Sequence, residues 1–439
     1  MMKFNKINLA FLGIIFSGIT VFAQDSSYLS MDEAVSTAVE NNSNIKLSEW
    51  DRKVANAGFR QTDAIFLPQI SVGYTALTTN NPLNAFGFLL QQESVTAMDF
   101  DPAKLNNPGA TQNYGAQVEA KLPLINMDMI FARKGAKVQE EMYQYKSQRT
   151  KEYIEYEVKK AYTQLQLSYR AKAVLQKSLD DVRQIYQSVN NFYNQGLIQK
   201  SDVLSAQIQV NTIESALAKA ESNILNASDG LRLLMGMDAG NEPYITDTLL
   251  QKITQPQAYT ELSLRADMLA MNKAVDAAGQ MVKSSKMAFL PRINAFGTYQ
   301  LNDSEAFKFR NESYLAGINL SWSIFSGNQN HSKMKSAQFQ FNKMREERDL
   351  QLRQSRLELD KTLRELHDLQ IEIDKQKVSL EQADEALRIL TNRYREGLVS
   401  TTDLLTAQAR SSQQELLLAQ AVMSYNITQA YVEFLSKTE

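Results

Sequence analysis

The chain has 439 residues, a formal net charge of −2 and a hydrophobic content of 44 %. The near-zero charge gives no reason to expect nucleic acid or an anionic membrane surface as a partner. The absence of cysteine excludes disulfides and the attachment of a lipid to an N-terminal cysteine. Only 17 glycines and 8 prolines predict few turns and therefore long helices.

The N-terminus is typical of a secretory signal peptide. Lys3 and Lys6 precede an apolar stretch over residues 7–22, which is short for a membrane anchor, and Ala23 ends a suitable cleavage sequence. We expect a signal peptide over residues 1–23. No later segment approaches the ~18–20 consecutive apolar residues of a transmembrane helix. A chain of this kind that spans a membrane must do so with β-strands.

The rest of the chain is internally duplicated. Residues 66–70 (FLPQI) recur as residues 289–293 (FLPRI), and residues 193–197 (YNQGL) recur as residues 394–398 (YREGL). The offset between the copies falls from 223 to 201 because the first copy is longer around residues 80–111. A repeat that keeps its order in this way indicates a duplicated supersecondary unit.

Each copy predicts a helix, two strands, a long helix, a turn and a further helix. Ser30 and Glu33 form a capping-box pattern at the first helix, and Pro68 and Pro291 end the helices before the strands. Alternating polarity predicts strands at about 70–78, 112–124, 292–301 and 313–325. A soluble sheet with one wet face would show the same alternation. Strands of about ten residues with aromatic ends fit a lipid-facing wall equally well.

The long helices carry a coiled-coil pattern. Residues 127–193 contain no proline, and a helix of that length would extend roughly 100 Å. The second copy keeps a seven-residue apolar seam, formed by Leu352, Leu359, Leu366, Ile373, Leu380, Leu387 and Tyr394. A sustained seven-residue repeat predicts coiled-coil packing, here as two antiparallel helical hairpins with tips at 193–204 and 394–405.

These elements predict a chain divided into two repeats. We expect the first repeat over residues 24–238, a linker over 239–258 and the second repeat over 259–439. Four strands cannot close a membrane barrel, for which about eight is the minimum. Because open strand edges are not tolerated in lipid, membrane-embedded strands would require several chains to share one barrel, and three chains would supply twelve strands.

The order of these motifs resembles the TolC-like outer membrane factor family, also described as outer membrane efflux proteins. The resemblance rests on the duplicated Phe-Leu-Pro joints, on the two Tyr-x-x-Gly-Leu turns, and on the strand-to-helix joints at residues 122–126 and 322–327. It implies a mainly α fold with a membrane β-barrel, in which a homotrimer builds a 12-stranded barrel in the outer membrane and an α-helical tunnel in the periplasm. The implied function is the passive exit duct of a tripartite efflux or type I secretion system.

The resemblance also implies partners and site residues. The hairpin tips would dock a periplasmic adaptor protein, and through it an inner-membrane pump, which places Gly196, Leu197, Gly397 and Leu398 in the docking surface. The segment at 80–111 would be the first extracellular loop, and its apolar side chains would cover the barrel mouth or pack between protomers.

The periplasmic entrance would be narrowed by acidic side chains just past each turn. Asp202 and Asp403 both lie six residues after a turn glycine, and Tyr394 would hydrogen-bond Asp202 across the hairpins in the closed state. An aspartate in the first turn of a helix also complements the helix dipole, so these residues have a structural alternative.

Chemistry at an active site is not indicated. The only histidines are His331 and His367, which lack paired metal-ligand spacing, and the sequence has no glycine-rich phosphate loop. We therefore expect no enzyme activity, cofactor or bound metal. The strongest competing hypothesis is a periplasmic coiled-coil adaptor or scaffold, which would share the signal peptide and the hairpins. The four strands placed alike in both copies favour the duct.

Overall fold

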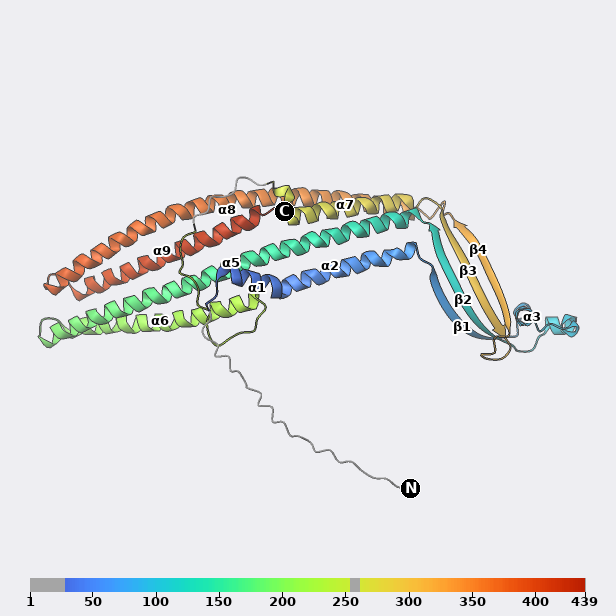
Figure 1. Ribbon diagram of the computed structural model, residues 1–439, viewed down its shortest axis with the longest axis horizontal. Helices are drawn as coiled ribbons and strands as arrows, with labels where there is room; N and C mark the ends of the chain where they lie inside the picture. The colour runs from blue at the N-terminus through green and yellow to red at the C-terminus, as the bar shows by residue number, and fades with distance from the viewer. Residues whose placement is uncertain (1–27, 253–260, 439) are drawn as a thin grey trace, which may run out of the picture.

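The computed structural model describes residues 28–252 and 261–438. The predicted signal peptide and part of the predicted linker, residues 253–258, lie outside the described residues. Figure 1 shows a long rod of helices that ends in a bent four-stranded sheet, with a small helical segment beyond the sheet.

The main helices and strands follow the same order in both copies. The first copy consists of α1 (Met31–Asn41), α2 (Ser43–Gln61), the 3₁₀ helix η1 (Thr62–Ile65), β1 (Gln69–Thr79), α3 (Pro82–Gln91), η2 (Ala97–Phe100), α4 (Pro102–Asn106), β2 (Thr111–Ile125), α5 (Met127–Asn194) and α6 (Lys200–Leu234). The second copy consists of η3 (Leu262–Leu264), α7 (Ala266–Met287), β3 (Arg292–Asp303), β4 (Asn311–Ser321), α8 (Gln329–Arg395) and α9 (Thr401–Ser436). The helices α3, η2 and α4 occupy the longer segment of the first copy.

Helices α5 and α8 set the length of the molecule. They contain 68 and 67 residues, which corresponds to about 100 Å each. Each forms an antiparallel hairpin with the helix that follows it, α6 or α9 (Figure 1). The predicted seam of α8 faces inward: Leu359, Leu366, Ile373 and Tyr394 are buried, and the other three seam residues are partly buried.

The sheet has the order β1-β2-β3-β4 with antiparallel pairing throughout. The two copies therefore meet in the middle of the sheet, between β2 and β3, and β1 and β4 are its edges. Strand β4 ends at Ser321, four residues before the predicted end at 325. Strand β2 continues to Ile125 because β3 pairs with it that far, whereas no strand among the described residues pairs with the corresponding end of β4.

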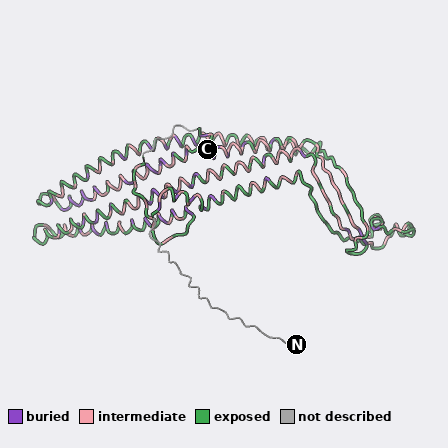
Figure 2. Tube along the Cα trace, in the orientation of Figure 1, coloured by how far each residue is buried: buried purple, intermediate pink, exposed green. Residues whose placement is uncertain are grey.

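The buried core follows the helix contacts along the rod, while the sheet is exposed or half-buried over most of its length (Figure 2). Halfway along the rod, α1 and the residues after α6 wrap around α5. There the fully buried Tyr162 hydroxyl donates to the backbone oxygen of Leu29 at 2.8 Å, and burial raises the pKa of Tyr162 to about 12. This region holds the start of the first copy against α5 and α6.

Candidate functional site

The two hairpin tips are built alike. Helix α5 ends at a turn in which Gly196 has a φ of 75° and its N–H donates to Tyr193 O at 2.8 Å. Helix α8 ends in the same way, since Gly397 has a φ of 73° and donates to Tyr394 O at 3.0 Å. This left-handed conformation favours glycine, and no atom lies within 4 Å of where a Cβ would stand, so backbone conformation is the reason for glycine here.

The tips present an exposed leucine and an aspartate in the first turn of the following helix. Leu197 and Leu398 are each 65 % exposed. Asp202 accepts a hydrogen bond from Gln199 N at 3.2 Å, and Asp403 accepts one from Ser400 Oγ at 2.7 Å. The Asp202 carboxylate therefore binds the backbone at the start of α6, whereas at α9 the capping side chain is Ser400, whose Oγ accepts from Asp403 N at 3.1 Å.

Tyr394 lies between the two hairpins near the tips. Its side chain is 5 % exposed, and its ring centroid is 5.7 Å from that of Phe192 on the other hairpin. Its hydroxyl lies 3.1 Å from Thr401 Oγ1, and within the described residues this contact replaces the suggested bond to Asp202. Burial raises the pKa of Tyr394, and the negative charge of Asp202 acts in the same direction.

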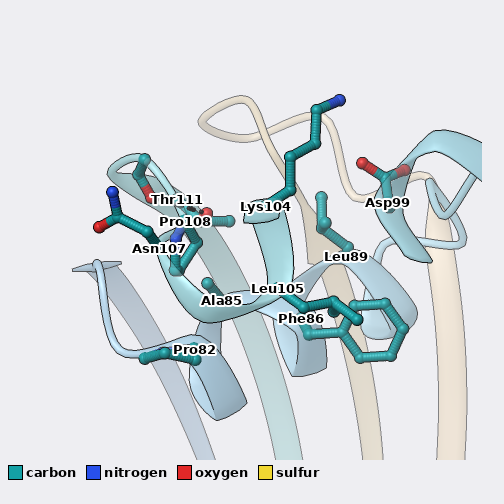
Figure 3. Close-up of a pocket in the computed structure, with 11 residues that line it drawn as sticks. Pro82, Ala85, Phe86, Leu89, Asp99, Lys104, Leu105, Asn107, Pro108 and Thr111 are labelled. Carbon is teal, nitrogen blue, oxygen red and sulfur yellow. Dashed lines mark hydrogen bonds between the residues drawn. The ribbon is translucent and has the colours of Figure 1, made fainter. Parts of the chain in front are cut away.

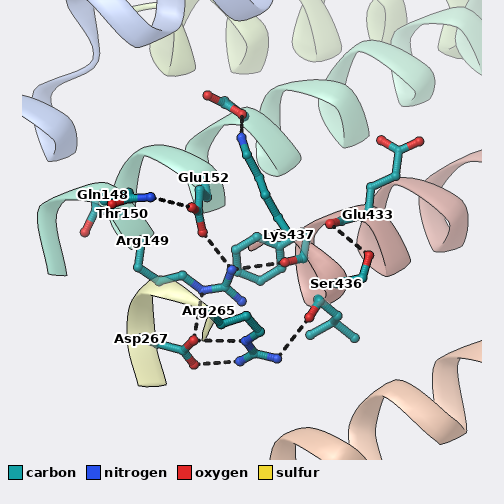
Figure 4. A network of polar contacts seen from close by, with 12 residues as sticks. Gln148, Arg149, Thr150, Glu152, Arg265, Asp267, Glu433, Ser436 and Lys437 are labelled. Atoms are coloured by element: carbon teal, nitrogen blue, oxygen red, sulfur yellow. Dashed lines mark hydrogen bonds and ion pairs between the residues drawn. The ribbon is translucent and has the colours of Figure 1, made fainter. Parts of the chain in front are cut away.

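A buried cluster of charged residues connects the end of α9, the start of α7 and the middle of α5 (Figure 4). Arg149 of α5 donates to Glu152 at 2.9 Å and to Phe434 O at 3.0 Å. Arg265, which is 2 % exposed, donates to Asp267 at 2.6 and 2.9 Å and to Leu435 O at 3.2 Å. The two arginines therefore bind the last carbonyl groups of α9 and join both repeats at one point.

The carboxyl group of Asp267 stays ionised in this cluster. Burial opposes its ionisation, but the hydrogen bonds and charge of Arg265, together with the charge of Arg149, hold the pKa of Asp267 below its usual value. Sequence reasoning missed this cluster because Arg149 and Phe434 are 285 positions apart. The only local signal was the placement of Arg265 and Asp267 around the start of α7.

The sheet has one apolar and one polar face. On the apolar face Val72, Val118, Tyr299 and Tyr314 stand in register across the four strands. Several apolar side chains of this face are widely exposed in the single chain, including Val72 at 77 % and Ile318 at 70 %. The opposite face is mostly polar and carries Ser71, Thr75, Gln117, Glu119, Asn294, Thr298, Ser313 and Asn319. Such a sheet fits between an apolar medium and water.

The helical segment over 80–111 is fastened to the polar face. The buried Gln92 side chain donates to Asn113 Oδ1 at 2.9 Å, and Asn113 in turn donates to Asn302 Oδ1 at 3.0 Å. Asn311 donates to Gln92 O at 2.7 Å. Gly115 leaves the room for this network, because a Cβ there would lie 3.2 Å from Asn302 Oδ1. All three asparagines lie on the polar face, so the segment is attached to the sheet on that side.

The segment has a small apolar interior of its own. Ala85, Phe86 and Leu89 of α3 and Leu105 of α4 line a cavity of about 260 Å³ (Figure 3). Phe86 also makes an edge contact with Phe100 at 5.6 Å. The hydrogen bonds of Gln92 hold the segment at the end of the strands, and both positions predicted for it, over the barrel mouth or between protomers, stay predictions.

Over residues 28–252 and 261–438, no helix is both long and apolar enough to cross a membrane. In a comparison with protein families, the family model described as outer membrane efflux protein matches residues 34–237 and 258–435 of the chain. No curated protein matches the chain.

Several solved structures share the fold. The chain is 17 % identical to CusC, with a TM-score of 0.80 and coverage of 95 % of this chain and 96 % of CusC. It is 19 % identical to the outer membrane protein VceC of Vibrio cholerae, with a TM-score of 0.75 and coverage of 93 % and 96 %. It is 14 % identical to the open state of the MtrE outer membrane channel of Neisseria gonorrhoeae, with a TM-score of 0.74 and coverage of 92 % and 88 %.

These findings confirm the resemblance and the fold class predicted from the sequence, with mainly helical structure and four antiparallel strands. Because the family model covers most of the chain, the protein belongs to the outer membrane efflux protein family.

Proposed function

We propose that this protein is the passive outer-membrane exit duct of a tripartite efflux or type I secretion system. The observation that carries the proposal is a two-faced sheet joined directly to two helices about 100 Å long, α5 and α8. The sheet suits the boundary between lipid and water, and these helices are long enough to carry a conduit deep into the periplasm.

In this proposal three chains share one barrel of twelve strands. Each chain has two free strand edges, and open edges are not tolerated in lipid. The apolar face would contact lipid and the polar face would line a water-filled passage. Residues 24–238 and 259–439 then serve as the two repeats of each protomer, joined by the linker over 239–258.

The hairpin tips would be the periplasmic entrance and the adaptor-docking surface. Leu197 and Leu398 beside Gly196 and Gly397 give each tip a small exposed apolar knob, which suits the end of a partner's helical hairpin. The adaptor would link the duct to an inner-membrane pump that selects the cargo.

The gate of this entrance would involve Asp202, Asp403 and Tyr394. Tyr394 packs the hairpin of one repeat against the hairpin of the other, so separation of the hairpins requires this contact to break. Adaptor binding would favour the open state by binding it more tightly than the closed state.

The exposed apolar sheet face argues against the alternative of a soluble periplasmic adaptor or scaffold, because such a face would be a large unprotected patch in water. Reconstitution in planar bilayers tests the proposal. The protein purified from the membrane fraction should form ion-conducting channels, and heat-dissociated protein serves as the control. A protein that is recovered as a soluble monomer and never conducts would contradict the proposal.

A further inference from the structure

An apolar groove opens in the middle of the rod, where α9 ends and α7 begins. Both helices pack against α5 and α8, so they occupy the same layer, and this layer is interrupted where they meet (Figure 1). On α7 the small side chains of Ala270 and Ala274, one turn apart, border the interruption. The space left there has a volume of about 750 Å³ and is lined by residues of all four helices.

The groove is lined by three methionines and two aromatic residues, namely Met142, Tyr153, Met271, Met344 and Phe434. The Tyr153 side chain is 47 % exposed, and its ring lies 5.9 Å from that of Phe434 between centroids. Methionine side chains adapt to the shape of a neighbour, and their sulfur atoms make favourable contacts with aromatic rings. This lining therefore suits a ligand built from aromatic or aliphatic rings.

The charges in the lining balance. Lys146 and Arg149 contribute two positive charges, and Asp267 and Glu347 contribute two negative ones. Arg149 is paired with Glu152 at 2.9 Å, and Asp267 is held within the same cluster of charged residues (Figure 4). Removal of an ion from water is costly without an opposite charge to receive it. A lining without net charge therefore favours an uncharged ligand.

The residues that follow α6 mark one side of the rod at this level. The Tyr169 hydroxyl donates to Tyr244 O at 2.8 Å, and Gln166 Nε2 donates to Asp247 O at 3.1 Å. At about 100° per residue, Tyr153 in the groove lies about 150° around α5 from Gln166 and Tyr169. The residues that follow α6 and the groove are therefore on opposite sides of α5.

Helix α8 shows the same division. Arg356 and Asp360 border a separate cavity of about 400 Å³ together with Leu262 of η3. Glu347 and Gln351, which line the groove, lie about 160° around α8 from Arg356 and Asp360. The described residues between the repeats therefore bind one side of the rod, and the groove opens on the other.

A passage enclosed by three chains stays open only when the residues that join the repeats lie on its outside, which places the groove on the inner side. We infer that the groove is a binding site in the conduit wall for uncharged, ring-containing apolar molecules; this inference rests on the proposed duct. The volume lies within the roughly 300–1,000 Å³ of small-molecule sites. From Met142 to Tyr153 the groove extends about 16 Å along α5, which fits a drug-sized molecule better than a partner helix.

The position of the groove also argues for a cargo molecule as its occupant, because only what enters the passage reaches it. The other repeat does not reproduce this lining. With the offset of 223 between α2 and α7, Met271 corresponds to Ser48 and Ala274 corresponds to Asp51. Packing of the duplicated unit therefore does not require apolar residues at this junction, and each chain contributes one such groove.

Photolabelling of the trimer in lipid nanodiscs tests the site. The probe is phenyl trifluoromethyl diazirine, which is aromatic and uncharged, and phenylnaphthylamine serves as the competitor. Ala274→Glu places a carboxylate in the groove, and the matched control Ala218→Glu places one at an exposed position of α6 outside it. Labelling of the lipid-facing strands, which should not saturate, reports the dose of the probe in every sample.

Peptides over residues 142–153 and 267–274 should be labelled saturably, and phenylnaphthylamine should suppress this labelling. At a half-saturating dose the labelling should fall about tenfold or more in Ala274→Glu, because the ligand would bury an unpaired carboxylate, and should not change in Ala218→Glu. Competition in the wild-type protein tests the site even if Ala274→Glu does not assemble.

Thiol modification of this cysteine-free chain tests on which side the groove opens. Thr150→Cys lies in the groove, and Ser263→Cys, a similar change, lies in the cavity beside η3. A charged thiol reagent should change the single-channel conductance of Thr150→Cys and leave that of Ser263→Cys unchanged.

The outcomes separate the binding site from the duct. A conducting trimer without saturable labelling of the groove peptides, or with equal labelling in both glutamate variants, overturns the binding site and leaves the duct standing. A conductance change in Ser263→Cys alone overturns the placement of the groove on the inner side. A protein that never conducts overturns the proposed function itself.

Discussion

Removal of the Tyr394 ring should open the periplasmic entrance. Tyr394→Ala deletes a side chain that is 5 % exposed and contacts Phe192 of the other hairpin. Truncation of a buried aromatic side chain costs about 3–5 kcal/mol. Separation of the hairpins breaks the same contact in the wild type. The substitution therefore destabilises the closed state and leaves the free energy of the open state unchanged. A change of about 3 kcal/mol shifts the closed-to-open ratio on the order of 100-fold.

Tyr394→Phe should have a much smaller effect. It keeps the ring and removes only the hydroxyl that lies 3.1 Å from Thr401 Oγ1. Loss of one such hydrogen bond costs about 0.5–1.5 kcal/mol. Tyr425→Ala is the matched control, because Tyr425 is 6 % exposed but belongs to the core that α8 and α9 form with Leu262, away from the tips.

Single-channel recording in planar bilayers measures the effect. The open-state occupancy should rise strongly for Tyr394→Ala and slightly for Tyr394→Phe, and should not change for Tyr425→Ala. Equal increases for Tyr394→Ala and Tyr425→Ala would show that general loss of packing opens the channel, and unchanged occupancy in Tyr394→Ala would remove Tyr394 from the gate.

Three further outcomes follow from the structure. Asp267→Asn should destabilise the protein by about 3–5 kcal/mol in denaturant unfolding, because Arg265 stays buried without its carboxylate partner. Folding lowers the pKa of Asp267, so the ionised carboxylate contributes to the free energy of unfolding above about pH 4, and this contribution is lost as the pH falls through the folded pKa. The variant should therefore lose this part of the acid dependence of stability. Gln92→Ala should speed protease cleavage within residues 82–108 on intact cells, whereas Gln112→Ala, which keeps the backbone acceptor, should not. Leu398→Asp should reduce cross-linking of periplasmic protein to the tips in intact cells while Leu398→Met should not, and equal cross-linking in both would exclude Leu398 from docking.

The parts of the fold that repeat locally could be predicted from the sequence. The seven-residue seam of α8 and the glycine turns at 196 and 397 have short-range causes, namely helical periodicity and a left-handed backbone conformation. The strands were predictable because polar and apolar residues alternate along them. The end of β4 at Ser321 differed from the prediction because strand ends depend on a neighbouring strand, which periodicity does not report.

The candidate site depends on contacts that the sequence does not display. Tyr394 was predicted as a partner of Asp202, but its hydroxyl lies beside Thr401 of its own hairpin, since the turn at Gly397 brings the two together. The charge cluster around Arg265 and the anchor at Gln92 join residues from distant parts of the chain. Only the folded arrangement of the two repeats brings them into contact.

Electron cryo-microscopy of the protein extracted from outer membranes in detergent tests the shared barrel most directly. A duct built from three chains should appear as particles with threefold symmetry, twelve strands in one closed barrel and a helical conduit about 100 Å long beneath it. Particles without threefold symmetry, or a sheet of four strands that remains open in each particle, would contradict it.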